Sequence, residues 1–63
     1  MGQVTEANMT YTIKDHATNK QYQVESMVKV PLDTVWKSQR NWFSKNSKVT
    51  IEDENGNYKT FNK

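Results

Sequence analysis

The amino-acid sequence predicts an α+β fold: a single small domain of order ββαββ, whose four-stranded, largely antiparallel sheet carries one amphipathic helix on one face. Three observations lead to this prediction. Apolar residues recur at helical spacing between Pro31 and Asn46, they alternate with polar residues between positions 9 and 30, and two β-favouring segments flank the turn-forming residues 53–56. Because the helical stretch contains both tryptophans, its apolar side should form the centre of the core.

Positions 9 to 30 contain two predicted strands. Met9, Tyr11 and Ile13 alternate with polar residues, which is the pattern of a half-buried strand. The polar segment at 15–19 is short enough to join two antiparallel neighbours. The second strand is predicted over 20–30. Its apolar residues fall on one face, with Ser26 interrupting them: Tyr22, Val24, Val28 and Val30.

One helix of about four turns is predicted from Pro31 to Asn46. Pro31 cannot donate to a sheet and suits a first helical turn, where Asp33 opposes the helix dipole and can pair with Lys37. At 100° per residue the apolar residues form one stripe centred on Gln39. The members of this stripe are Leu32, Val35, Trp36, Trp42 and Phe43. The two tryptophans lie on opposite flanks of the stripe, so they cannot both be central.

Two further strands are predicted at 48–53 and 58–61, and the pattern leaves the order of the four strands in the sheet open. With a helix on one face, the opposite face of the sheet should meet solvent. Its predicted members are polar: Thr10, Thr12, Lys14, Gln21, Gln23, Glu25, Lys29 and Thr50.

The last two strands should form a hairpin, and its register has two alternatives. A three-residue loop with Gly56 in the left-handed conformation places Val49 opposite Phe61 on the core side. A two-residue loop instead pairs Glu52 with Lys59 and turns Phe61 to the other face.

Length and composition predict one domain with a thin core. The chain has 63 residues, of which 33% are hydrophobic, and a formal net charge of +2. Residues 1–8 carry no periodic signal and are predicted to be a flexible N-terminal arm before a domain that spans 9–63. The chain has no cysteine, so disulfides cannot support the core, and oligomerisation is another common way to stabilise a small scaffold.

The residues present predict a non-enzymatic protein with no cofactor, no metal site and no small-molecule substrate. The single histidine, His16, lies in a predicted turn with no nucleophile near it. The acidic residues 52–54 lack the spacing of a calcium loop, and Gly2 and Gly56 form no phosphate-binding loop. Apolar runs are too short for a transmembrane segment, so we expect no membrane partner and a cytoplasmic location.

The surplus of large apolar residues favours a protein interface. Partly exposed tryptophan is a frequent anchor at interfaces, although core packing is the alternative for each tryptophan alone. We therefore predict a small interaction module that binds a protein partner or forms a homo-oligomer through an edge strand and the Trp42 flank of the helix. The candidate interface residues are Trp42, Trp36 and Met27.

A second hypothesis is nucleic-acid binding by a basic helix face. Between Thr34 and Ile51 the chain has four basic residues and no acidic one, and Trp42 could stack on a base. The same cations also complement the dipole at a helix C-terminus, which is a purely structural explanation. The candidate contacts are Lys37, Arg40, Asn41, Lys45 and Lys48.

Overall fold

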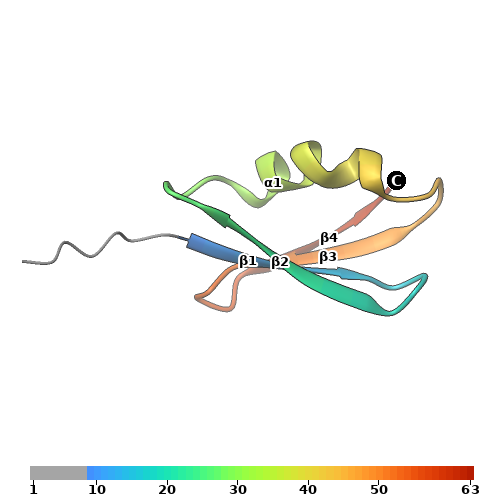
Figure 1. Cartoon of the computed structure of the whole chain (residues 1–63), viewed down its shortest axis with the longest axis horizontal. Helices are drawn as coiled ribbons and strands as arrows, with labels where there is room; N and C mark the ends of the chain where they lie inside the picture. Colours follow the sequence, from blue (N-terminus) through green and yellow to red (C-terminus); the bar gives the residue numbers. More distant parts are fainter. Residues whose placement is uncertain (1–8) are drawn as a thin grey trace, which may run out of the picture.

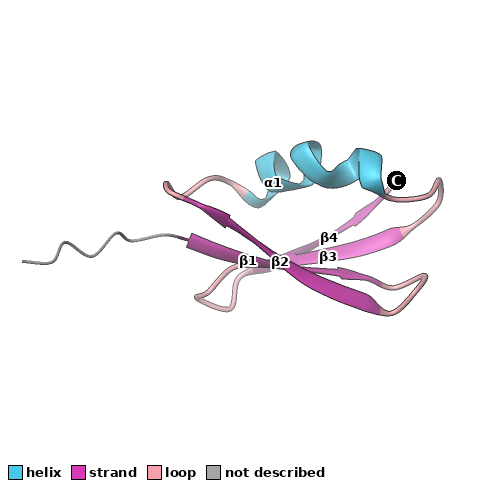
Figure 2. Ribbon diagram, viewed as in Figure 1, coloured by secondary structure: helices cyan, strands magenta, loops and turns pink. Residues whose placement is uncertain are grey.

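The computed structural model describes residues 9–63, which form a four-stranded sheet with helix on one face (Figure 1). The elements are β1 (Met9–Asp15), β2 (Lys20–Ser26), α1 (Leu32–Gln39), the 3₁₀ turn η1 (Arg40–Trp42), β3 (Lys48–Glu52) and β4 (Tyr58–Asn62) (Figure 2). The predicted ββαββ order and α+β class are confirmed. The predicted arm at residues 1–8 lies outside the described residues.

The strand order, which the sequence left open, is β2-β1-β3-β4 with every neighbouring pair antiparallel. In the centre of the sheet Ile13 of β1 lies opposite Ile51 of β3, and both side chains have 0% exposure. The two N-terminal strands therefore meet the C-terminal hairpin through β1 and β3. Strands β2 and β4 are left as the edges of the sheet.

The register of the C-terminal hairpin follows the three-residue alternative. Val49 lies opposite Phe61, and Gly56 has a φ of 91°. The N–H of Asp53 donates to the carbonyl of Asn57 at 2.8 Å, and the Asp53 carboxylate accepts the N–H of Asn55 at 2.8 Å. The two-residue loop, which pairs Glu52 with Lys59, is therefore wrong.

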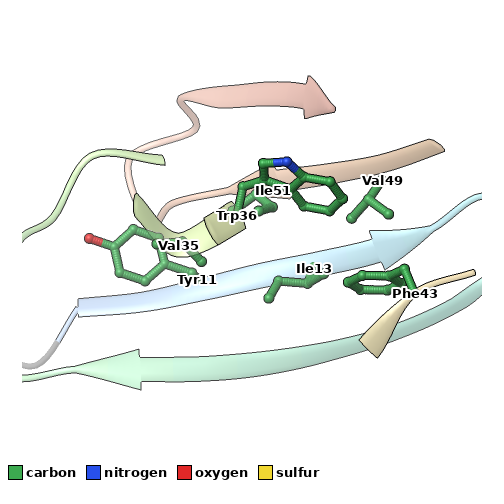
Figure 3. Close-up of a cluster of buried hydrophobic side chains, with 7 residues drawn as sticks. All are labelled: Tyr11, Ile13, Val35, Trp36, Phe43, Val49 and Ile51. Carbon is green, nitrogen blue, oxygen red and sulfur yellow. The ribbon is translucent and has the colours of Figure 1, made fainter. Parts of the chain in front are cut away.

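The core lies between the sheet and the helical segment (Figure 3). Its seven buried hydrophobic side chains are Tyr11, Ile13, Val35, Trp36, Phe43, Val49 and Ile51. The indole of Trp36 stacks on two rings, with centroid distances of 5.9 Å to Phe43 and 5.2 Å to Phe61. The Tyr11 hydroxyl donates to the carbonyl of Val30 at 3.1 Å and accepts a hydrogen bond from the N–H of Val30 at 3.0 Å. Tyr11 thus joins β1 to the segment that enters the helix.

The helix is shorter than predicted. Helix α1 ends at Gln39, three residues of 3₁₀ helix follow, and Phe43 has an extended backbone with φ −108° and ψ 152°. Ser, Asn and similar residues bond to nearby backbone and favour helix ends, and they are frequent from Ser38 onward. Because a 3₁₀ turn has about 3.0 residues rather than 3.6, the predicted stripe breaks here. Phe43 enters the core, whereas Trp42 is 78% exposed.

Two further details of the helix differ from the prediction. Asp33 bonds to Lys59 of β4, with 2.8 Å between Oδ1 and Nζ, rather than pairing with Lys37. Pro31 precedes α1 as its N-cap, with φ −62° and ψ 151°, and its carbonyl accepts the N–H groups of Thr34 and Val35. The Asp33–Lys59 pair is more than half exposed, so it contributes about 0–1 kcal/mol.

Strand β2 is also shorter than predicted, because it ends at Ser26 rather than Val30. The Ser26 hydroxyl donates to the carbonyl of Val28 at 2.6 Å and accepts its N–H at 3.2 Å, and this local turn replaces the sheet ladder. The prediction that Val28 faces the core is wrong, since it is 63% exposed. Lys29 lies in the same loop and not on the open sheet face.

The remaining polar residues predicted for the open face all lie in strands. In β1 and β3 they alternate with the buried residues of the core side, and in β2 they alternate with Tyr22 and Val24, which lie opposite Ile13 and Tyr11. On this face the His16 Nε2 lies 2.8 Å from the Thr50 hydroxyl, which lies 2.9 Å from the Thr60 hydroxyl. His16 therefore has a structural partner across the sheet.

Replacing Gly56 with alanine tests the three-residue hairpin loop. An added Cβ would meet nothing within 4 Å, so the cost arises only from the left-handed backbone at φ 91°. We expect Gly56→Ala to lower the free energy of unfolding by about 1–2 kcal/mol, measured by urea titration. Asn55→Ala in the same loop should change it by less than about 0.5 kcal/mol. Equal effects of the two variants would contradict the assigned loop.

Candidate functional site

A groove lies between edge strand β2 and the helical segment. Helix α1 packs against β3 and β4, so it leaves much of the same face of β2 uncovered. Tyr22 of β2 is 37% exposed, and Val24 is half-buried. The Tyr22 hydroxyl donates to Gln39 Oε1 at 3.1 Å, and this bridge divides the groove into two parts.

The larger part, which we call the Trp42 groove, has a volume of about 640 Å³. It is lined by Asp15, Thr18, Lys20, Tyr22, Gln39, Trp42, Phe43 and Ser44. Its floor is aromatic, because the ring of Tyr22 stacks on Phe43 with centroids 6.3 Å apart. Trp42 adds a third, largely exposed ring. An apolar surface bordered by a few polar groups is typical of a binding site.

The second part of the groove lies farther along β2 and has a volume of about 260 Å³. Its walls come from Val24, Glu25 and Ser26 on the strand side and from residues of α1 on the other side. The two parts together follow β2 from its first residue to its last. A ligand that fills both parts would therefore lie along the edge strand.

The Tyr22 phenol is held in its neutral form. Partial burial, and after it the negative charge of Asp15, raises the pKa of Tyr22 above its ordinary value of 10.0. Asp15 itself is fixed by the β1–β2 turn, since its carboxylate accepts the N–H of Ala17 at 2.9 Å and the hydroxyl of Thr18 at 3.2 Å. The neutral phenol retains the proton that it donates to Gln39 Oε1 across the groove.

Within residues 9–63, acidic and basic side chains are concentrated at opposite ends of the sheet, measured along the strands. The loop after β2 and the β3–β4 turn lie at one end, and the β1–β2 turn and the segment after η1 lie at the other (Figure 1). The first end is acidic and contains Glu25, Asp33, Glu52, Asp53 and Glu54, with two exceptions, Lys29 and the Lys59 that bonds to Asp33. The second end is basic and contains Lys14, Lys20, Arg40, Lys45, Lys48 and Lys63, with Asp15 as an exception. The Trp42 groove therefore lies at the basic end.

The three predicted interface residues lie in different places. Trp42 is at the rim of the groove beside the start of β2. Met27 follows the end of β2 and is 77% exposed. Trp36 is in the core, with 9% exposure, so it takes the core role that was the alternative for each tryptophan. Within one chain, Trp42 and Met27 thus lie at opposite ends of the same strand.

The five predicted nucleic-acid contacts are all exposed, but they do not share one helix face. Lys37 is in α1, Arg40 and Asn41 are in η1, and Lys45 follows in a loop. Lys48 alternates with the buried Val49 in β3, so it lies on the sheet face opposite the helix. Lys20 of β2 and Lys63, which directly follows β4, also lie at the basic end, and the Lys63 ammonium donates to the carbonyl of Phe43 at 2.8 Å.

Sequence reasoning missed several residues of the groove. It placed Tyr22 on the apolar face of its strand and Gln39 at the centre of a helix stripe, but it did not predict that these two side chains meet across a groove. It gave no role to Thr18, Lys20 or Ser44, because their proximity depends on the strand order and on the end of the helix. The only feature of the sequence that indicated this site was the position of Trp42 on one flank of the apolar helix stripe, where partial exposure was expected.

Other kinds of site are not found in residues 9–63. This range contains no group of three or more His, Cys, Asp or Glu residues placed to hold a metal ion. Nor does it contain a helix of the length and apolar character that crossing a membrane requires. Comparisons with protein-family models, with curated proteins and with solved structures find no match.

The electrostatic link between Asp15 and Tyr22 can be tested by titration. Asp15→Asn keeps a hydrogen-bond acceptor for the turn but removes the charge, so the pKa of Tyr22 should fall and yet stay above 10.0, since burial is the larger cause. Because the folded state favours the neutral phenol, this stabilisation is complete below pH 10 and is lost as the pH rises through the pKa of the folded state. An NMR titration of the Tyr22 ring measures the shift. Glu25→Gln, at the far end of β2, should leave it unchanged; a Tyr22 pKa insensitive to Asp15→Asn would contradict the link.

Proposed function

We propose that this chain is a small non-catalytic interaction module that binds a protein partner, either a different chain or a second copy of itself, through the edge of β2 and the Trp42 groove. The observation that supports this proposal is the position of an exposed tryptophan and an apolar groove directly beside β2, an edge strand of the sheet. Extended segments commonly add to free sheet edges, where backbone hydrogen bonds provide affinity and side-chain pockets provide specificity.

Strand β2 is better suited to pairing than β4, the other edge. Lys59 lies within β4, bonds to Asp33 and lies 5.7 Å from the centre of the Phe61 ring, and a lysine on an edge strand disfavours further pairing. Helix α1 also packs against β4. The inner part of β2, from Gln21 to Val24, has no charge, and its helix side is partly open.

Trp42 is the expected anchor of the interface. Tryptophan is enriched among the residues that dominate binding energy, especially where surrounding contacts exclude water. An apolar side chain of the partner that enters the Trp42 groove would contact Tyr22 and Phe43 and cover part of Trp42, which is 78% exposed in the single chain. The polar groups of Gln39 and Ser44 would border that contact.

Two exposed aromatic residues provide a matched test of this proposal. Trp42 lies beside β2, and Tyr58, which is 69% exposed, lies on β4 at the other edge. In affinity capture from extract of the native host, Trp42→Ala should lose the specific protein partner, with at least about a tenfold fall in recovery, whereas Tyr58→Ala should retain it. Nuclease treatment of the extract should not change the result. A partner retained equally by both variants would contradict the proposal.

Nucleic-acid binding is a second candidate function, and the concentration of basic residues at the Trp42 end favours it. Phosphates could contact Lys20, Arg40 and Lys45 while a base stacks on Trp42, as occurs in proteins that bind single strands. The predictions of a non-enzymatic role and of a cytoplasmic location remain predictions alongside either function.

Titration with random-sequence single-stranded DNA and RNA at low salt tests the second candidate. If it holds, binding should quench tryptophan fluorescence and weaken steeply with salt, and Arg40→Ala should reduce affinity by about threefold or more. Lys29→Ala, which removes a basic residue of the acidic end, is the control and should have little effect. No binding at low ionic strength would leave the basic end as ordinary solvated surface.

A further inference from the structure

We infer that the partner of this surface is a second copy of the same chain, bound so that the two β2 strands pair antiparallel about a twofold axis at Gln23 and the Met27–Val28 segment of each copy covers the Trp42 groove of the other. This inference rests on the proposed function, because it uses the same strand edge and the same groove.

The length and alternation of β2 are compatible with this arrangement. The strand has seven residues, Lys20–Ser26, and Gln23 is the middle one. Pairing along the whole strand places Lys20 opposite the partner's Ser26 and Tyr22 opposite the partner's Val24. Paired residues then lie on the same face, so both helices cover one side of a continuous eight-stranded sheet. Tyr22 and Val24 are the half-covered side chains of that side, and each would gain an apolar neighbour.

The exposed apolar side chains also become complementary. The structure has five exposed large hydrophobic residues among those described: Tyr22, Met27, Val28, Trp42 and Tyr58. All but Tyr58 lie on β2 or near its ends. Since Lys20 is opposite the partner's Ser26, the partner's Met27 and the partner's Val28 follow toward Thr18, which lines the Trp42 groove together with Lys20. The same contact occurs twice, as a twofold interface requires.

The distribution of charge favours an antiparallel rather than a parallel pair. Glu25 and Glu54 lie together at the acidic end, because Thr10 pairs with Glu25 and donates its N–H to Glu54 at 3.0 Å. Lys20 is at the other end of β2, and Lys45 follows the groove residue Ser44. Antiparallel pairing brings each acidic end beside the basic end of the partner subunit, whereas parallel pairing would place like charges together.

A single-cysteine experiment tests this arrangement, because the natural chain has no cysteine. Gln23→Cys places one thiol of each copy beside the twofold axis, and directly opposite residues of antiparallel strands have Cα atoms about 4.5–5.5 Å apart, within the range of a disulfide. Mild oxidation should convert most of this variant to a covalent dimer. Thr60→Cys, on the same sheet face of the other edge strand, is the control and should stay largely uncrosslinked.

Sedimentation velocity provides the second readout. Wild-type chain should show a concentration-dependent monomer–dimer equilibrium. Gln23→Lys, which places two positive charges opposite each other on an exposed position, should raise the dissociation constant by about tenfold or more. Thr60→Lys should leave it within about twofold, because Thr60 lies outside the paired edge. Met27→Ala should also weaken the dimer, since it removes, without adding a charge, the side chain that covers the partner subunit's Trp42. Circular dichroism verifies that each variant is folded.

The outcomes separate this inference from the proposed function. A folded wild-type chain that stays monomeric at millimolar concentration, or equal crosslinking of Gln23→Cys and Thr60→Cys, would overturn the dimer. If the chain is monomeric but captures another protein in a Trp42-dependent manner, the dimer alone is overturned and an extended segment of a different chain takes its place. If the chain is monomeric and its capture is unchanged by Trp42→Ala, both are overturned.

Discussion

The stacking of Trp36 between Phe43 and Phe61 determines where the helical segment lies, and the rest of the surface follows from that position. The ring centroids are 5.9 Å and 5.2 Å from the indole, and α1 packs against β3 and β4. Aromatic side chains of this size provide a large share of the buried area in a small domain, so the helix cannot move toward β2 without losing its main contact. An eight-residue helix over one half of a four-stranded sheet necessarily leaves the other half partly open.

The change from α1 to the 3₁₀ turn η1 gives the uncovered half of the sheet the shape of a groove. If the helix had continued in regular form, Trp42 would have remained near the apolar stripe. Because the backbone tightens at Arg40 and becomes extended at Phe43, the two consecutive aromatic side chains point to different environments. Phe43 is 8% exposed and its ring stacks on that of Tyr22, whereas Trp42 is 78% exposed at the rim of the groove. One local transition therefore supplies both the floor and the edge of the Trp42 groove.

The sequence predicted the fold well and the groove poorly, for identifiable reasons. Alternation with period two and stripes with period 3.6 depend on local backbone geometry, so the order ββαββ followed from residues close in sequence. The hairpin register was narrowed to two alternatives, and only the structure, with Val49 opposite Phe61, decides between them. The strand order β2-β1-β3-β4 depends on contacts between distant residues, which pattern alone does not encode. Helix and strand ends were also misjudged, because the hydroxyl of Ser26 and the polar residues after Ser38 compete for backbone hydrogen bonds. Tyr22 and Gln39 became recognisable as neighbours only after the strand order and the end of the helix were known.

The loop that contains Met27 and Val28 is restrained at both ends, which affects the thermodynamics of any association there. On one side the Ser26 hydroxyl makes two hydrogen bonds to Val28, and on the other the Tyr11 hydroxyl makes two to Val30. Because these bonds restrict the backbone between them, it has less conformational entropy to lose than an unrestrained loop when another surface covers it. When a flexible loop becomes ordered on binding, the lost entropy offsets part of the free energy gained from apolar contact. A segment that is already restrained before binding loses less entropy, so more of that free energy contributes to affinity. The two exposed apolar side chains on this restrained loop can therefore contribute more to affinity than their area alone would indicate.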